Sequence, residues 1–143
     1  MSLASMGQVV FHTGVADKVD YIARLVRKGS RQGARMVVVC EDPAAVSTAL
    51  WGGAPVDFVV HATAHSDAAT WLASSVVLMT SPSVPGRDLS RDVLVNACEA
   101  WPETHAHYLR VIELVGQAPG DVAAGRERWK KYMSAGVQPD KLG

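Results

Sequence analysis

The side chains best suited to bind a ligand stand near the C-terminus of this 143-residue sequence, where cations alternate with aromatic rings. The order there is Arg126-Glu127-Arg128-Trp129-Lys130-Lys131-Tyr132. Arginine binds carboxylates through paired hydrogen bonds, and an aromatic ring receives an apolar side chain. The segment therefore indicates a receptor for an acidic peptide with an apolar end. The same groups can contact phosphates and stack bases, so direct binding of single-stranded DNA stays an alternative.

A helix over residues 121–135 is predicted to carry these side chains, capped by the aspartate at its start and ended by the glycine that follows it. One face of this helix is an apolar stripe, formed by Val122, Trp129, Tyr132 and Met133. Arg126 and Lys130 lie along one edge of the stripe, and Arg128 lies along the other. Two interpretations are open. The stripe can pack on a sheet and leave the cations in solvent, or the cations and Trp129 can bind a partner. One helix can also do both.

Other kinds of chemistry have weak support. Residues 12–17 follow the first predicted strand but contain one glycine and no lysine, so neither the phosphate-binding nor the dinucleotide-binding glycine motif is present. His61 and His65 are four residues apart, but no cysteine or carboxylate stands at a zinc-binding spacing from them. The loop serines lack a G-x-S-x-G motif. We expect no cofactor and no metal; an enzyme on a Rossmann-like scaffold stays open, because catalytic groups can converge from remote positions.

The composition is that of a folded domain, with 48% hydrophobic residues, 20% charged residues and a formal net charge of zero. A neutral chain offers no overall field to attract nucleic acid or an anionic membrane, and no apolar run approaches the ~18 residues needed to cross a bilayer. Cys40 and Cys98 stand in apolar settings that favour free thiols and a cytoplasmic location. Because a second methionine follows at Met6, residues 1–5 are expected to be an expression remnant and 6–143 a single domain.

Strands and helices are predicted to alternate along the chain. Strands are expected at 8–12, 35–40, 76–80, 93–96 and 108–115, with an extended segment at 57–61 and a helical turn at 101–103. Helices are expected from Asp17 to about Gly29 and from Asp42 to Trp51. The apolar run at 35–40 is typical of a strand covered on both faces. The sequence therefore predicts an α/β fold: a three-layer α/β/α sandwich with a mostly parallel sheet, Rossmann-like without a phosphate-binding loop, with antiparallel additions left open.

The C-terminal segment resembles the R-x-R-[WY]-K-x-Y…G ending of the chi subunit of bacterial DNA polymerase III. Further matches follow in the family's order and extend the resemblance over nearly all of residues 9–137: Val39-Cys40-Glu41-Asp42, Leu50-Trp51, Phe58-Val59-Val60-His61, Asp92-Val93-Leu94-Val95-Asn96 and Arg110-Val111-Ile112-Glu113-Leu114-Val115. The resemblance implies a non-catalytic accessory subunit of the DNA-directed DNA polymerase holoenzyme. Such a subunit pairs one-to-one with the psi subunit, which links it to the clamp loader, and binds the acidic C-terminal tail of single-stranded DNA-binding protein (SSB). It meets DNA only indirectly.

The resemblance also implies roles for individual residues. The matching positions assign Arg126 and Lys130 to the carboxylates of the tail and Trp129 to its apolar end, with Arg128 and Met133 beside them. Trp51 and Phe58 match partner-facing aromatic residues, which serve the tail or psi unless they pack in the core. The segment 40–51 is about one helical turn shorter than the family pattern, and Val122 stands where some members have a lysine, which predicts a somewhat weaker tail site.

Overall fold

The computed structural model describes residues 8–51, 61–63, 74–81 and 92–142. Within these ranges, seven strands form one sheet in the order β3-β4-β2-β5-β6-β1-β7. The strands are β1 (Gln8–Val15), β2 (Met36–Val39), β3 (His61–Thr63), β4 (Val76–Met79), β5 (Val93–Asn96), β6 (Arg110–Gly116) and β7 (Asp140–Leu142). Every pairing between these described strands is parallel, so the predicted parallel sheet is confirmed.

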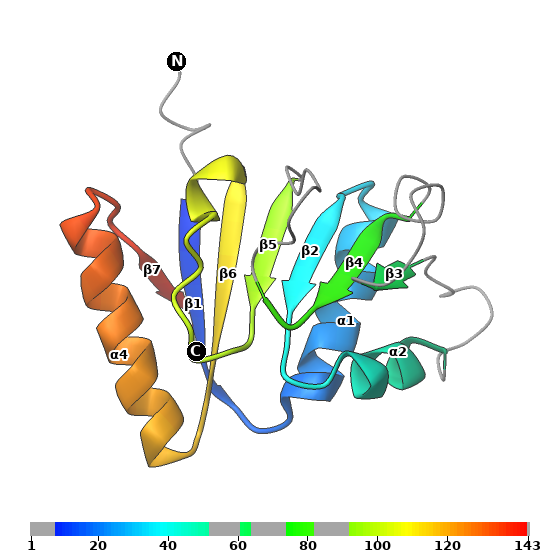
Figure 1. The fold of residues 1–143 in the computed structure, drawn as a ribbon, viewed down its shortest axis with the longest axis horizontal. Helices are drawn as coiled ribbons and strands as arrows, with labels where there is room; N and C mark the ends of the chain where they lie inside the picture. The colour runs from blue at the N-terminus through cyan, green and yellow to red at the C-terminus, as the bar shows by residue number, and fades with distance from the viewer. Residues whose placement is uncertain (1–7, 52–60, 64–73, 82–91, 143) are drawn as a thin grey trace.

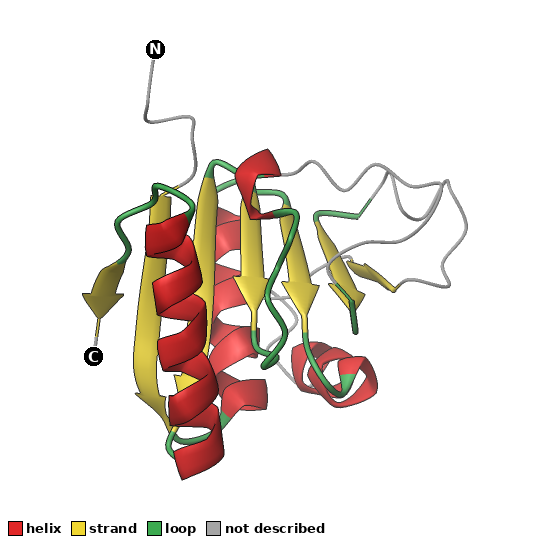
Figure 2. Ribbon diagram, turned by 60° about the vertical axis from the view of Figure 1, so that its left-hand side comes forward, coloured by secondary structure: helices red, strands yellow, loops and turns green. Residues whose placement is uncertain are grey.

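Helices cover both faces of the sheet, as Figures 1 and 2 show. They are α1 (Lys18–Arg31), α2 (Pro43–Trp51) and α4 (Pro119–Ser134), together with a short 3-10 helix at His105–His107. Successive side chains of β2 point to opposite faces, so Val38 packs under α1 and α2 while Val37 packs under α4. Each face thus has its own apolar core. The predicted three-layer α/β/α sandwich is confirmed.

Two of the predicted helix starts, at Asp17 and Asp42, are confirmed by their capping bonds. Asp17 accepts a hydrogen bond from the Asp20 backbone N–H at 3.1 Å, and Asp42 accepts one from the Ala45 backbone N–H at 3.1 Å. The predicted end of α1 near Gly29 is wrong by two residues. Gly29 stays helical, and it is Gly33, with φ of 80°, that adopts the left-handed conformation after the helix.

The shorter elements differ from the sequence prediction in position or in number. The helical turn expected at 101–103 is the 3-10 helix at His105–His107. Strand β7 was not predicted, because its three residues have no strand pattern and it forms by pairing with the edge of β1. Of the extended segment expected at 57–61, all but its last residue lies outside the described residues, and His61 begins β3.

Asp121 does not cap α4, which begins two residues earlier, at Pro119. Its carboxylate instead accepts a hydrogen bond from the Gly116 backbone N–H and pairs with the Lys18 ammonium at 2.9 Å. Lys18 also donates to the Ala97 carbonyl oxygen at 2.9 Å. These bonds tie together the carboxyl ends of the central strands, the region where folds of this architecture hold a phosphate. Both charged side chains are therefore engaged in structural contacts.

Asp121→Asn is expected to lower the free energy of unfolding by about 1–2 kcal/mol at pH 7. Burial raises the pKa of Asp121, but the Gly116 N–H and the Lys18 ammonium outweigh burial and lower the pKa below its ordinary value of 3.8. A depressed native pKa contributes stability at neutral pH that is lost as the pH falls through that region. Urea unfolding at a series of pH values should therefore show the gap between wild type and variant closing below pH 3.8. A gap that stays constant down to pH 3 contradicts this account.

Candidate functional site

The position of α4 is set by two contacts with the sheet. Gly125 is buried against β6, where a Cβ atom would lie only 2.8 Å from Val115 Cγ2, so the helix can approach this closely only with glycine there. One turn further on, the Trp129 ring packs on Phe11 of β1, with ring centroids 5.0 Å apart and an interplanar angle of 56°. Tyr132 meets Phe11 edge-on at 5.9 Å. The helix therefore crosses from β6 to β1 in a defined orientation.

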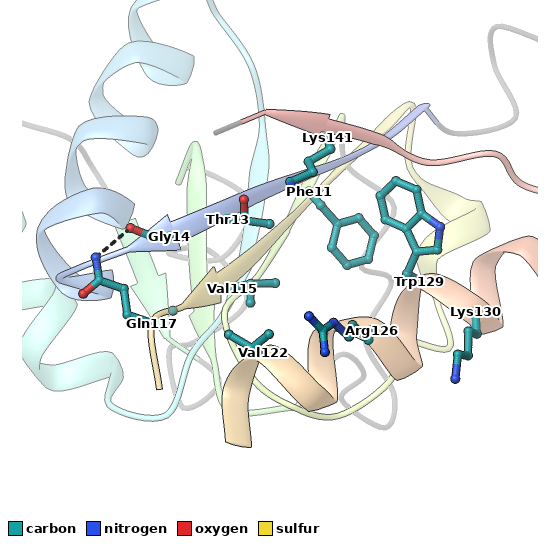
Figure 3. Close-up of a pocket in the computed structure, with 12 residues that line it drawn as sticks. Phe11, Thr13, Gly14, Val115, Gln117, Val122, Arg126, Trp129, Lys130 and Lys141 are labelled. Carbon is teal, nitrogen blue, oxygen red and sulfur yellow. Dashed lines mark hydrogen bonds between the residues drawn. The ribbon is translucent and has the colours of Figure 1, made fainter. Parts of the chain in front are cut away.

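A pocket of about 550 Å³ opens between α4 and strands β1, β6 and β7 (Figure 3). We call it the α4 pocket. The residues that line it are Phe11, Thr13, Gly14, Val115, Gly116, Gln117, Val122, Gly125, Arg126, Trp129, Lys130 and Lys141. Phe11, Val115 and Val122 form an apolar inner surface, and Trp129 closes one side. The pocket can therefore hold an apolar group of the size of a large side chain.

The charges that line the α4 pocket are all positive. Arg126 and Lys130 come from exposed positions one turn apart on α4, and Lys141 comes from the edge strand β7. Arg126 makes no ion pair in the part of the chain that the structure describes, and Lys130 pairs with Glu127 at 3.5 Å. Both members of that pair are about 70% exposed, so it contributes little and can be exchanged for another carboxylate. The pocket thus presents cations that can bind an anionic ligand.

The remaining polar groups of the α4 pocket are uncharged. The Gln117 amide donates to the Gly14 carbonyl oxygen at 3.1 Å, which joins the ends of β6 and β1, and Thr13 contributes a hydroxyl group. No carboxylate, imidazole or thiol occurs among the described residues that line the pocket. The arrangement suits recognition of a ligand that is negatively charged and partly apolar.

The structure brings together three of the residues singled out in the sequence, Arg126, Trp129 and Lys130. Met133 belongs to the same helix but does not line the α4 pocket and is 50% exposed. It lies about 100° around the helix from Tyr132, which faces the sheet, and so points toward solvent. The predicted apolar stripe is therefore wrong at Met133.

Arg128 was expected at one edge of the apolar stripe, beside the residues that bind the partner; instead its side chain is buried and only 2% exposed. Its Nε atom donates to Glu113 Oε1 at 2.8 Å, and Nη1 donates to the Glu99 carbonyl oxygen at 3.2 Å. Glu113, on β6, also accepts hydrogen bonds from Tyr132 at 2.7 Å and from Asn96 at 3.0 Å. Arg128 faces the sheet because this buried carboxylate pairs with it there. It is not available to a partner.

Burial and neighbouring charges shift the pKa values of two members of this cluster, Glu113 and Tyr132. Burial raises the pKa of the Glu113 carboxyl, while the Arg128 guanidinium and the hydrogen bonds from Tyr132 and Asn96 act in the opposite direction. Burial and the neighbouring Glu113 also raise the pKa of the Tyr132 hydroxyl. The cluster is a structural network under α4.

The two aromatic residues from the middle of the sequence are not part of the α4 pocket as described. Trp51 ends α2, on the sheet face opposite α4, and is 63% exposed (Figure 1). Phe58 lies outside the described residues. Trp51 therefore does not pack in the core, and it belongs to a different surface from Arg126.

Several pocket residues were missed by reasoning from the sequence. Phe11 and Val115 looked like ordinary strand residues, and they line the pocket only because α4 crosses over β1 and β6. Lys141 comes from the unpredicted strand β7. Gly125 carried a signal that could have been read, because a glycine inside a helix marks a close approach to its neighbour.

Neither a cluster of metal ligands nor a membrane-spanning helix occurs among the described residues. In the ranges that the structure describes, no group of three or more histidine, cysteine or acidic side chains is placed to hold a metal ion. Within the same ranges no helix combines the length and apolar character needed to cross a bilayer. Cys40 and Cys98 are both free thiols, and burial raises the pKa of Cys40 to about 12, so it is unreactive at neutral pH.

Comparison with known proteins decides the family. The model of the family "DNA polymerase III chi subunit, HolC" matches residues 6–140. The chain belongs to the DNA polymerase III chi subunit family. A DNA polymerase III subunit chi from Pseudomonas aeruginosa strain PAO1 is 29% identical over 122 residues, which are 83% of this chain and 81% of that protein. The resemblance drawn from the sequence motifs is thus confirmed.

Membership of the chi family places the chain in DNA replication, as an accessory subunit associated with the DNA polymerase III holoenzyme. In this member of the chi family, a parallel sheet with helices on both faces carries a cationic pocket beside α4. The charge and the apolar lining of that pocket limit the kinds of ligand that it can bind.

Proposed function

We propose that the α4 pocket binds the acidic C-terminal tail of SSB and that the chain, paired one-to-one with psi, links SSB to the clamp loader without catalytic activity of its own. The observation that carries this proposal is the combination of an apolar inner surface with Arg126, Lys130 and Lys141 around it. A peptide with acidic residues and an apolar end has both parts that such a pocket selects.

The geometry suggests how the tail lies. The apolar end lies beside Trp129 against Val115 and Val122, while its carboxylates meet Arg126 and the two lysines. Figure 3 shows Trp129 standing beside Phe11, with Arg126 projecting from α4 on the side nearer Val122. Arginine and tryptophan are the residue types that most often dominate binding energy at interfaces.

The surface around Trp51 supports a second partner. The indole ring of Trp51 is 63% exposed at the end of a helix, and tryptophan is a residue type that is enriched at protein interfaces. Because α2 and α4 cover opposite faces of the sheet, a psi subunit bound at Trp51 leaves the α4 pocket open. One chain could then hold both partners at once, which an adaptor requires.

An accessory role without chemistry is also consistent with how the polar groups at the strand ends are used. Lys18 and Asp121 bind each other and the backbone, and Asn96 and Glu113 belong to the buried Arg128 network. These groups hold the fold together at the place where enzymes of this architecture carry their sites.

Arg126→Ala is expected to weaken binding of an SSB C-terminal peptide by about ten- to a hundredfold, because one charge-assisted hydrogen bond contributes about 1.5–3 kcal/mol. The measurement is fluorescence anisotropy of a labelled tail peptide with the full chain. Raising the salt concentration should weaken the wild-type complex as well.

Lys131→Ala is the matched control, since it removes the same charge from the same helix at an exposed residue outside the pocket. It should leave the affinity within about twofold, as expected for a rim charge. Equal affinity of wild type and Arg126→Ala, or equal losses in the two variants, would falsify the proposed tail site.

A further inference from the structure

Strand β7 is the last strand at one end of the sheet, and its outer backbone edge has no partner strand in the part of the chain that the structure describes (Figure 1). Along its inner edge it pairs in parallel with β1, where Lys141 stands opposite Phe11. All three residues of β7 are exposed. A strand in this position presents N–H and C=O groups that are open to another chain. We call the outer side of residues 140–142 the β7 edge.

The β7 edge is continuous with the α4 pocket. Lys141 and Phe11 are partners in adjacent strands, so they share a face of the sheet, and both line the pocket. Figure 3 shows Lys141 beside Phe11 on the side of the pocket that β7 forms. Side chains alternate between faces along a strand, so Asp140 and Leu142 point to the opposite face. A peptide that leaves the pocket over Lys141 therefore reaches the β7 edge next.

Charge decides which chains can pair with the β7 edge. Lys141 is exposed and makes no ion pair among the described residues. A lysine on an edge strand hinders pairing between copies of the same chain, because like charges would meet there. An acidic peptide has the complementary charge. The edge therefore favours an acidic partner over a second copy of this chain.

We propose that the acidic tail assigned to the α4 pocket continues as an added strand along the β7 edge, an inference that rests on that proposed function. Three strand spacings separate β6 from a strand added outside β7, which at about 4.8 Å each amount to about 14 Å. An extended chain advances about 3.3 Å per residue and covers this distance in about four residues. The last residues of the tail thus lie in the pocket and across Lys141, and those before them pair with β7.

Strand addition has a signature of its own. It uses the main chain of the peptide, whereas the pocket contacts its side chains. Along a strand, the N–H groups point alternately to the two sides, so only every second residue of the tail can donate to β7. Because β7 has three residues, we expect about one or two such donors.

The test replaces single backbone amides of the SSB tail peptide by esters, which removes one N–H donor and keeps every side chain. Labelled peptides of about ten residues, each with one ester, are titrated against the full chain by fluorescence anisotropy, with the all-amide peptide as the matched control. One or two alternate positions, about five to eight residues from the C-terminal end, should lose about two- to tenfold in affinity, the range expected for one hydrogen bond. Esters at the positions between them should stay within about twofold of the control. Hydrogen exchange of the backbone amides at 140–142 should also slow in the complex with the control peptide.

The outcomes separate this proposal from the tail site. If the all-amide peptide does not bind, the tail site fails and strand addition fails with it. If that peptide binds but the ester peptides all bind equally well, or all lose affinity equally, strand addition is wrong and the tail site stands. A dimer that persists in sedimentation at saturating peptide would place a second copy at the β7 edge and would also overturn the proposal.

Discussion

Arg128→Met is expected to destabilise the protein by about 3–5 kcal/mol, a large part of the stability of a domain of this size. The variant leaves the Glu113 carboxylate fully buried with hydrogen bonds from Tyr132 and Asn96 but no countercharge. Breaking one side of a buried ion pair is far more costly than removing the pair as a whole. The free energy of unfolding, measured in urea, gives the result.

Two further variants sharpen that experiment. Arg126→Met removes the same kind of side chain two residues away, at an exposed position, and should change stability by no more than about 0.5 kcal/mol. Adding Glu113→Gln to Arg128→Met should recover part of the loss, because the neutral amide no longer leaves a buried charge. If the Arg128 and Arg126 variants are equally stable, the buried pair does not hold α4 on the sheet.

Trp129→Ala is expected to weaken binding of the SSB tail peptide by about 30- to 1,000-fold, equivalent to about 2–4 kcal/mol for an aromatic residue at the centre of an interface. The indole forms one side of the α4 pocket and packs on Phe11 at 5.0 Å. Its loss removes the apolar contact for the end of the tail and widens the pocket. Anisotropy titration with the labelled peptide measures the change.

Trp101→Ala controls for the loss of an indole on the same face. Trp101 packs on Tyr132, with ring centroids 4.4 Å apart, and does not line the α4 pocket. It should lower stability while leaving tail binding within about threefold, provided that the variant is folded at the assay temperature. A tail affinity that falls as much for Trp101→Ala as for Trp129→Ala would show that the effect comes from the core and not from the pocket.

Prediction from sequence succeeded where local signals are strong. The unbroken apolar run before Cys40 indicated a strand buried on both faces, and Val37 and Val38 do pack in the two separate cores. Asp17 and Asp42 marked helix starts because an aspartate side chain satisfies a free N–H group at that position. These features depend on neighbours along the chain.

The predictions that the structure contradicts depend on contacts between residues that are distant in the sequence. Arg128 looked like a surface cation because its neighbours in the sequence are charged. No residue near it in the sequence indicates that Glu113 lies buried beneath it. Asp121 looked like a cap, but Lys18, more than 100 residues earlier, comes to meet it across the ends of β1 and β6.

For the basic and aromatic segment from Arg126 to Tyr132, the sequence and the tertiary structure each determined a different property. Its residue types and order were enough to indicate the family and the kind of ligand, since these depend on chemistry carried along one helix. Which of its cations border the α4 pocket was decided only by the tertiary structure. Gly125 and the Glu113 carboxylate set the rotation of α4 on the sheet, so Arg126 and Lys130 border the pocket while Arg128, between them, is buried.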